Sequence, residues 1–489
     1  MPGDRQCADR RPRTLLEQLI REREATYEEQ VDAFMKLARQ LNEPATMSVR
    51  HLQRLASGER SGERATPSTR RVMRQLYGHG LDELLVASGL TASREEQAEG
   101  APLASVPPPP PKRLDLDRLV TLTDNADALG QLTAQVLNDP LAPTNLGVVS
   151  EAWQAAVVRW LLEPNPCTPG SDRRCRLMPV DIEVVRSATR MLADWDYQYG
   201  GGRSRLLVAQ CLATEALPLA RQVSSTSPLG RDYLSAVAAL TRLAGWTAYD
   251  IGSHGAAQRF LTLALNLARE AGDRPLGGRI LAGMSHQANY LGQYHRAVEL
   301  ARAAHEGARG QATPTSMALF YAMEARALAA MGDEGQCTRA LNHAEHALTH
   351  GNPNDDPEWI RFFDAAELHA ELAHCFRDLG RAQLAGEHAQ RSIQESDTVY
   401  VRSLSFCRVV LATAHLQRGD LEQALQIAHT VVDTAAQLRS RRVITYIHDF
   451  HRRLLPYGVD KQVAVFDEYV STRLPELELP PSADRVAPA

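Results

Sequence analysis

The chain has 489 residues, of which 44% are hydrophobic, 23% charged and only 6% aromatic, and its net charge at pH 7 is −5. This length predicts more than one domain, and the composition is that of an ordinary soluble protein. Alanine, leucine, arginine and glutamate recur throughout while strand-like runs are scarce, so the sequence predicts a nearly all-α protein.

Two further features bear on the compartment. No apolar run approaches the ~18 residues that a membrane span needs, and no apolar segment follows the basic first residues as in a secretory signal. The seven cysteines include no CxxC pair that would indicate a zinc finger or a redox motif. The sequence therefore predicts a cytoplasmic protein that does not contact a membrane.

The charge is distributed unevenly along the chain. Residues 1–80 contain fifteen Lys/Arg against eleven Asp/Glu, a net of +4, so the remainder carries −9. Residues 48–74 alone contain seven Arg against two Glu. A small basic head on a larger acidic body indicates an anionic partner for the head.

Residues 14–87 are predicted to form four or five short helices, because their apolar residues recur at helical spacing. In the second, Thr26 and Glu29 have the S/T-x-x-E spacing of a capping box. The third covers residues 48–58, SVRHLQRLASG, and the fourth begins with Pro67 at its first position.

The third helix is predicted to have two different faces. At 100° per residue one arc holds Val49, Leu52, Leu55 and Ala56, which would pack inward. The opposite arc holds Arg50, Gln53, Arg54 and Ser57, with His51 at its edge. Arginine and glutamine can bond guanine and adenine edges in a major groove.

TYEEQ, SVRHLQRLASG and TPSTRRVMRQLYG together resemble the core of Xre/lambda-repressor-type helix-turn-helix domains, although LNEPATM is longer than a tight turn between helices and Leu55-Ala56 replace the usual Trp-Glu. The resemblance implies that 48–58 is a recognition helix, that the domain binds double-stranded DNA, and that it acts as a homodimer. The expected base or phosphate contacts are Thr26, Tyr27, Ser48, Arg50, His51, Gln53, Arg54, Arg64 and Arg70.

Residues 88–113 form a predicted linker with five consecutive prolines, which favour a stiff polyproline segment. Residues 114–236 are predicted to be helical but atypical. Within them YGGGR, 199–203, has two readings: a plain turn between helices or a cradle for an anion. Two cysteines, Cys167 and Cys175, flank a loop rich in proline and arginine, where a redox role is an alternative to a structural one.

From about residue 237 the sequence repeats around glycines at intervals of 40, 40, 48 and 39 residues. These glycines are Gly252, Gly292, Gly332, Gly380 and Gly419. Small residues stand seven before and five and twelve after most of them, as close packing of two antiparallel helices requires. The pattern over 237–440 resembles tetratricopeptide (TPR) repeats, with capping helices at 441–475 and a disordered tail at 476–489.

The TPR resemblance implies a concave groove that binds a peptide or small-molecule effector. Ligand-facing positions lie six and three residues before each turn glycine. The residues predicted to line this groove are Trp246, Tyr249, His286, Asn289, Arg326, His374 and Arg377.

The sequence contains no GxxxxGK[ST], GxSxG or HExxH motif. We therefore predict no catalytic residues, no cofactor and no metal site; the histidine pairs His343/His346 and His369/His374 are compatible with chance. The fold expected is all-α, a helix-turn-helix bundle followed by a TPR-like α-solenoid. The function expected is a DNA-binding transcriptional regulator similar to large actinobacterial TPR regulators. The alternative is a TPR adaptor whose N-terminal bundle does not bind DNA.

Overall fold

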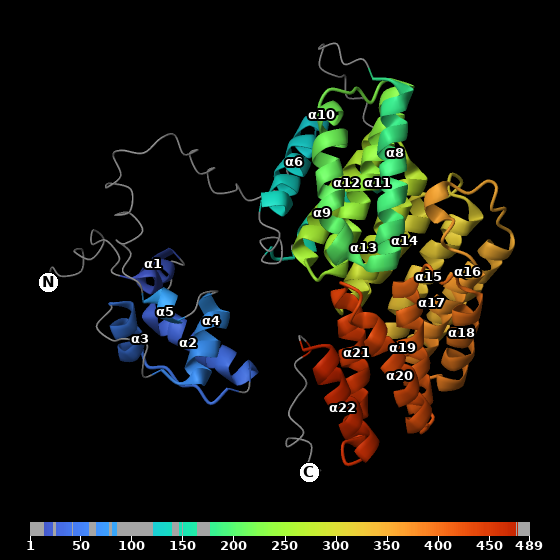
Figure 1. Cartoon of the computed structure of the whole chain (residues 1–489). Helices are drawn as coiled ribbons and strands as arrows, with labels where there is room; N and C mark the ends of the chain where they lie inside the picture. Colours follow the sequence, from blue (N-terminus) through green and yellow to red (C-terminus); the bar gives the residue numbers. More distant parts are fainter. Residues whose placement is uncertain are drawn as a thin grey trace, which may run out of the picture. The chain divides into compact units, whose positions relative to one another are not determined.

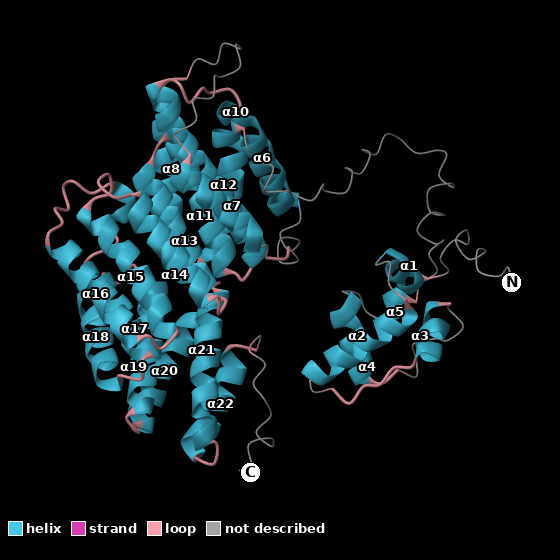
Figure 2. Cartoon of the chain, turned by 180° about the vertical axis from the view of Figure 1, so that it is seen from behind, coloured by secondary structure: helices cyan, strands magenta, loops and turns pink. Residues whose placement is uncertain are grey.

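The computed structural model describes residues 14–22, 26–41, 43–57, 65–77, 81–85, 121–138, 146–148, 150–163, 177–475 and 477. These residues form helices and connecting loops, and no β-strand occurs among them (Figure 2). The predicted all-α class is therefore confirmed for this part of the chain. The chain divides into two units, Met1–Pro109 and Pro110–Ala489, and the division falls within the proline run. The predicted linker, the Cys167–Cys175 loop and nearly all of the predicted tail lie outside the described residues.

The described residues of the first unit form a bundle of five short helices (Figure 1). Their buried apolar side chains make one core. The helices are α1 (Leu15–Glu22), α2 (Tyr27–Gln40), α3 (Val49–Ala56), α4 (Pro67–Tyr77) and α5 (Leu81–Leu84). The capping box at the start of α2 is present: the backbone N–H of Glu29 donates to the Thr26 hydroxyl, and the Thr26 N–H donates to the Glu29 carboxylate. Helix α3 packs Leu52, Leu55 and Ala56 into the core, as predicted.

The long connection between α2 and α3 is part of the bundle. Ala45 and Met47, on this connection, are buried in the core. The Arg71 guanidinium on α4 donates to both carboxylate oxygens of Glu43, at 2.6 and 2.8 Å, and so ties the same connection to α4. These contacts fix the start of α3 although the turn is longer than in a tight helix-turn-helix.

The second unit begins with helices that precede the repeated segment. They are α6 (Leu122–Asn138), α7 (Ser150–Leu162), α8 (Pro179–Tyr199), α9 (Gly201–Cys211), the π-helical turn η4 (Leu212–Ala216) and α10 (Leu217–Ala220). The boundary expected between 236 and 237 falls inside the next helix, α11, which begins at Pro228.

Five helix pairs follow. They are α11–α12 (Pro228–Asp250, His254–Ala271), α13–α14 (Arg274–Tyr290, Tyr294–Gly307), α15–α16 (Pro314–Ala330, Glu334–Thr349), α17–α18 (Ala365–Asp378, Ala382–Glu395) and α19–α20 (Val401–Gln417, Leu421–Ala435). The 3₁₀ turn η5 (Glu358–Ile360) lies between the third and fourth pairs. After the fifth come α21 (Arg441–Leu454), η6 (Leu455–Tyr457) and α22 (Lys461–Arg473).

Each turn glycine of the repeated pattern joins the two helices of one pair. The first helix ends two residues before the glycine and the second begins two residues after it. All five glycines have φ between 72° and 82°, the left-handed region that side chains with a Cβ rarely adopt. The alanine or cysteine five residues after each glycine is fully buried at the helix crossing. The prediction of close-packed helix pairs is thus confirmed.

The first helices of successive pairs contact one another in a row, and α21 continues this row by packing on α19. Helix α8 contacts both α11 and α19, so it bridges the beginning and the end of the row. In Figure 1 the row runs from the yellow-green α11 and α13 to the orange α19. The first helices therefore surround a common interior.

At YGGGR the chain turns between two helices at Gly200, whose φ is 81°, and Gly201 and Gly202 already belong to helix α9. A Cβ on Gly201 would lie 2.6 Å from the Thr247 carbonyl oxygen, and one on Gly202 would lie 2.7 Å from that of Arg439. The backbone N–H of Gly201 also donates to the Asp250 carboxylate at 2.9 Å. The glycines thus let α9 approach α11 and the connection before α21.

Candidate functional site

The outward face of α3 carries the side chains predicted to read DNA. Its N-cap Ser48 accepts a hydrogen bond from the backbone N–H of His51 at 3.3 Å. Arg50, Gln53 and Arg54 are exposed, whereas His51 is half-buried. Thus one helix presents two guanidinium groups and one amide on the side opposite its buried leucines.

The other predicted DNA-contacting residues flank this helix in the sequence. Thr26 is the exposed N-cap of α2, and Tyr27, its first residue, is half-buried. Arg70 on α4 is also half-buried. Arg64 lies outside the described residues. Arg71, next to Arg70 on α4, forms an ion pair with Glu43.

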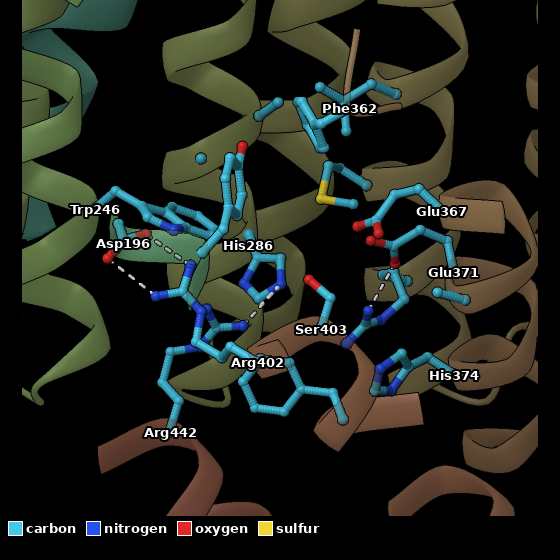
Figure 3. Close-up of a pocket in the computed structure, with 18 of the residues that line it drawn as sticks. Asp196, Trp246, His286, Phe362, Glu367, Glu371, His374, Arg402, Ser403 and Arg442 are labelled. Atoms are coloured by element: carbon cyan, nitrogen blue, oxygen red, sulfur yellow. Dashed lines mark hydrogen bonds and ion pairs between the residues drawn. The ribbon is translucent and has the colours of Figure 1, made fainter. Parts of the chain in front are cut away.

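The second unit has a cavity at the centre of its row of first helices (Figure 3). Side chains from α8, α11, α13, α15, α17, α19 and α21 line it, together with Phe362 from the loop after η5. The cavity offers about 80 Å³ to the centres of water molecules, several times the ~10–15 Å³ that one water requires. It is therefore large enough for a small organic molecule.

Four of the predicted groove residues line this cavity: Trp246, His286, Arg326 and His374. His286 and Arg326 also border a wider opening of about 440 Å³, which Asn289 and Arg377 line as well. Tyr249 is fully buried and lines neither space, so its predicted position in the groove is corrected. Its hydroxyl lies 2.9 Å from Nδ1 of His286, behind the cavity wall.

Arg402 holds one wall of the cavity together. It donates to both carboxylate oxygens of Asp196 on α8, at 3.0 and 2.7 Å, and lies 3.3 Å from the Asp250 carboxylate at the end of α11. Asp250 also accepts a hydrogen bond from the Ser440 hydroxyl at 2.8 Å. Although burial opposes its charge, the two carboxylates raise the pKa of Arg402. This buried network closes α8 onto α11 and α19.

Arg442 on α21 packs against the same wall. Its guanidinium carbon lies 4.6 to 5.2 Å from the ring centroids of Tyr249, Phe406 and Trp246. Its Nη2 lies 3.4 Å from Nε2 of His286. Because arginine can only donate, Nε2 accepts and Nδ1–H of the neutral ring points to Tyr249. Burial, and then the charge of Arg442, lower the pKa of His286 and keep it neutral.

The opposite wall holds a second buried ion pair. Arg326 on α15 donates to the Glu371 carboxylate on α17 at 2.6 Å, and both side chains are about 7% exposed. His374, one turn further along α17, has its pKa lowered by burial and by Arg326. Figure 3 shows Glu367, Glu371 and His374 facing Trp246, Arg402 and Arg442 across the cavity.

Two arginines of the cavity have no carboxylate within ion-pair distance among the described residues. Arg242 on α11 and Arg279 on α13 make no hydrogen bond and no ion pair with any residue that the structure describes. Arg279 is only 7% exposed and lies over the ring of Phe362, 4.7 Å from its centroid. Burial, with the charge of Arg242, lowers the pKa of Arg279 to about 9.

No family model matches the chain, and no curated protein matches it either. The described residues contain no group of three or more His, Cys, Asp or Glu side chains that could hold a metal ion. No helix in the described ranges is both long enough and apolar enough to cross a membrane. The site must therefore be interpreted from its own chemistry.

Sequence reasoning missed the deeper part of the cavity. It considered only positions six and three residues before each glycine, whereas Arg242 lies about one helical turn before Trp246 and Arg279 about two turns before His286. The sequence signal for these two residues was an arginine among the apolar residues of a helix predicted to be largely buried. For Phe362, the signal was the 48-residue interval, which contains the extra loop. Nothing in the sequence indicated that α8 would contribute Asp196.

Proposed function

We propose that the chain is a cytoplasmic transcriptional regulator that binds double-stranded DNA through its first unit. The exposed face of α3 carries this proposal. Arg50, Gln53 and Arg54 form one outward surface, and their chemistry suits guanine and adenine edges and the phosphates beside them. The net positive charge of residues 1–80 favours the same partner.

The second unit serves in this proposal as a TPR-like sensor. Its helix pairs surround a cavity with charged and aromatic side chains, a form typical of small-molecule sites. The head would act as a homodimer on a two-fold DNA site. An effector regulates DNA binding if the second unit, with and without the effector bound, holds the two DNA-binding units of the dimer in different arrangements.

The adaptor alternative is favoured by the repeated helix pairs, which are common scaffolds for protein binding. It differs from the regulator in what the first unit does. In the adaptor the first unit binds a protein and not DNA, so the chain would show no duplex binding for changes in the exposed α3 residues to alter.

The deciding experiment measures the affinity of the full chain for a mixed-sequence duplex across a salt series. A regulator binds at low salt, and log K falls linearly with log salt. Arg50→Ala should reduce the slope by roughly 1 if Arg50 contacts a phosphate, whereas Arg39→Ala, an exposed arginine late in α2, should leave it unaltered. Absence of duplex binding at low salt would favour the adaptor.

A further inference from the structure

The cavity in the second unit has more positive than negative side chains. Five arginines line it, against Asp196, Glu367 and Glu371. Asp196 is committed to Arg402, and Glu371 to Arg326. Arg242 and Arg279 therefore form no direct ion pair with a carboxylate of the described residues, although Asp196 attracts the first and Glu367 the second at longer range.

Glu367 does not correct this imbalance. Burial raises its pKa to about 8, with a smaller contribution from the charges of Glu371 and Asp364. At neutral pH the Glu367 carboxyl therefore keeps its proton and can donate a hydrogen bond. Glu367 and Arg279 both line the cavity and interact electrostatically, so Glu367 adds a neutral donor to a positively charged wall.

A buried arginine without an acidic partner is unfavourable unless something else neutralises it. The Nε of Arg279 is buried and has no hydrogen-bond partner in the described part of the chain. The ring of Phe362 covers one face of the guanidinium, and an aromatic ring carries no net negative charge that would neutralise it. The Arg279 guanidinium lines the cavity, and a negatively charged hydrogen-bond acceptor in the cavity would both accept from it and neutralise it.

The middle of the cavity is apolar. Its lining there is Ala282, Gly283, Leu319, Met323, Ala370 and Phe406. Gly283 faces open space, because a Cβ added to it would have no heavy atom within 4 Å. Arg279 lies seven residues before His286 on α13, so the two levels are about 10 Å apart. A ligand can therefore extend from the arginines past an apolar middle to the histidines.

We infer that this cavity binds a small organic carboxylate, with its anionic group at Arg242 and Arg279 and its apolar body along Gly283 and Met323. The planar guanidinium matches a carboxylate through paired N–H donors. The inference rests on the sensor part of the proposed function. It is tested without DNA, so its failure and a failure of DNA binding are distinguishable.

The test is calorimetric titration of the full-length chain with acetate, hexanoate and inorganic phosphate, and with uncharged hexanamide. Hexanoate should bind at least tenfold more tightly than hexanamide, because only the carboxylate neutralises the arginines. It should also bind more tightly than acetate or phosphate, which lack the apolar body. Equal binding of hexanamide, or no binding of hexanoate at millimolar concentration, would overturn the inference.

Two variants locate the binding. Arg279→Met removes the charge and keeps most of the length of the side chain. Gly283→Leu extends a side chain into the cavity from a position where an added Cβ meets no heavy atom within 4 Å. Both should reduce hexanoate affinity at least tenfold, whereas Arg361→Met, an exposed arginine outside the cavity, should not. If either variant is folded and still binds hexanoate with the affinity of the wild-type chain, the assignment is contradicted.

Discussion

At the scale of single residues, the buried network around Arg402 determines whether the row of helices stays closed. Asp196 and Arg402 are 2% and 3% exposed, and together they join α8 to α19. Removing one member of a buried pair leaves the other charge poorly compensated. The sequence alone did not indicate this pair, because its members are 206 residues apart.

Asp196→Ala should lower the free energy of unfolding of the second unit by about 3–5 kcal/mol, since Arg402 would then keep only Asp250 nearby. Glu183→Ala, on the same helix, breaks an exposed pair with Arg190 and should leave stability unaltered within error. Denaturant unfolding followed by circular dichroism measures both. If the two substitutions lower the free energy of unfolding by similar amounts, the Asp196–Arg402 pair contributes little to stability.

Glu367 gives a prediction about pH. Its pKa rises from 4.5 in the unfolded chain to about 8 in the fold, so its contribution to stability is full below pH 4.5 and is lost as pH rises towards 8. Burial is the main cause of the raised pKa, and the charges of Glu371 and Asp364 raise it further. Arg279 and Arg326 on the facing helices lower it by less.

Glu367→Gln removes this dependence. The gain in unfolding midpoint over the wild-type chain should therefore be small at pH 5 and increase up to pH 8. Thermal unfolding across this range measures it, with exposed Glu387→Gln as the matched control. A gain that does not grow with pH would contradict a protonated Glu367.

At the scale of helical elements, the turn glycines are required for their backbone conformation. Gly332 joins α15 to α16 with φ 76° and has no heavy atom within 4 Å of an added Cβ, so space is not its limitation. Gly332→Ala should lower stability by roughly 1–2 kcal/mol. Gly335→Ala, three residues later inside α16, should be neutral or slightly stabilising. Equal effects in denaturant unfolding would contradict this explanation.

The same elements show what the sequence could reveal. Period and turn glycines predicted the five helix pairs and the faces of α3, because these depend on local geometry. The positions six residues before the turn glycines correctly located Trp246, His286 and Arg326 at the cavity. The positions three residues before these glycines placed Tyr249 wrongly, because packing against His286 buries it. The deep arginines and the contribution of α8 depend on contacts distant in sequence, which no local pattern encodes.

At the scale of the whole molecule, the proposed regulator must couple its two units. If a carboxylate in the cavity changes affinity for DNA by some factor, DNA must change affinity for the carboxylate by the same factor. Titrating hexanoate with and without saturating duplex DNA measures this factor. Identical affinities would mean that cavity occupancy does not control the first unit, although each unit could still bind its own ligand.

The central claim is that the exposed face of α3 reads a DNA sequence. It is tested most directly by selecting duplexes from a random library with the full-length chain and sequencing those retained. The wild-type chain and Gln75→Ala, an exposed glutamine on α4, should enrich the same short two-fold motif. Gln53→Ala and Arg54→Ala should lose the preference at defined positions of that motif, each worth about 1–3 kcal/mol. Enrichment of no motif by the wild-type chain, or of an unchanged motif by both α3 variants, would contradict the account.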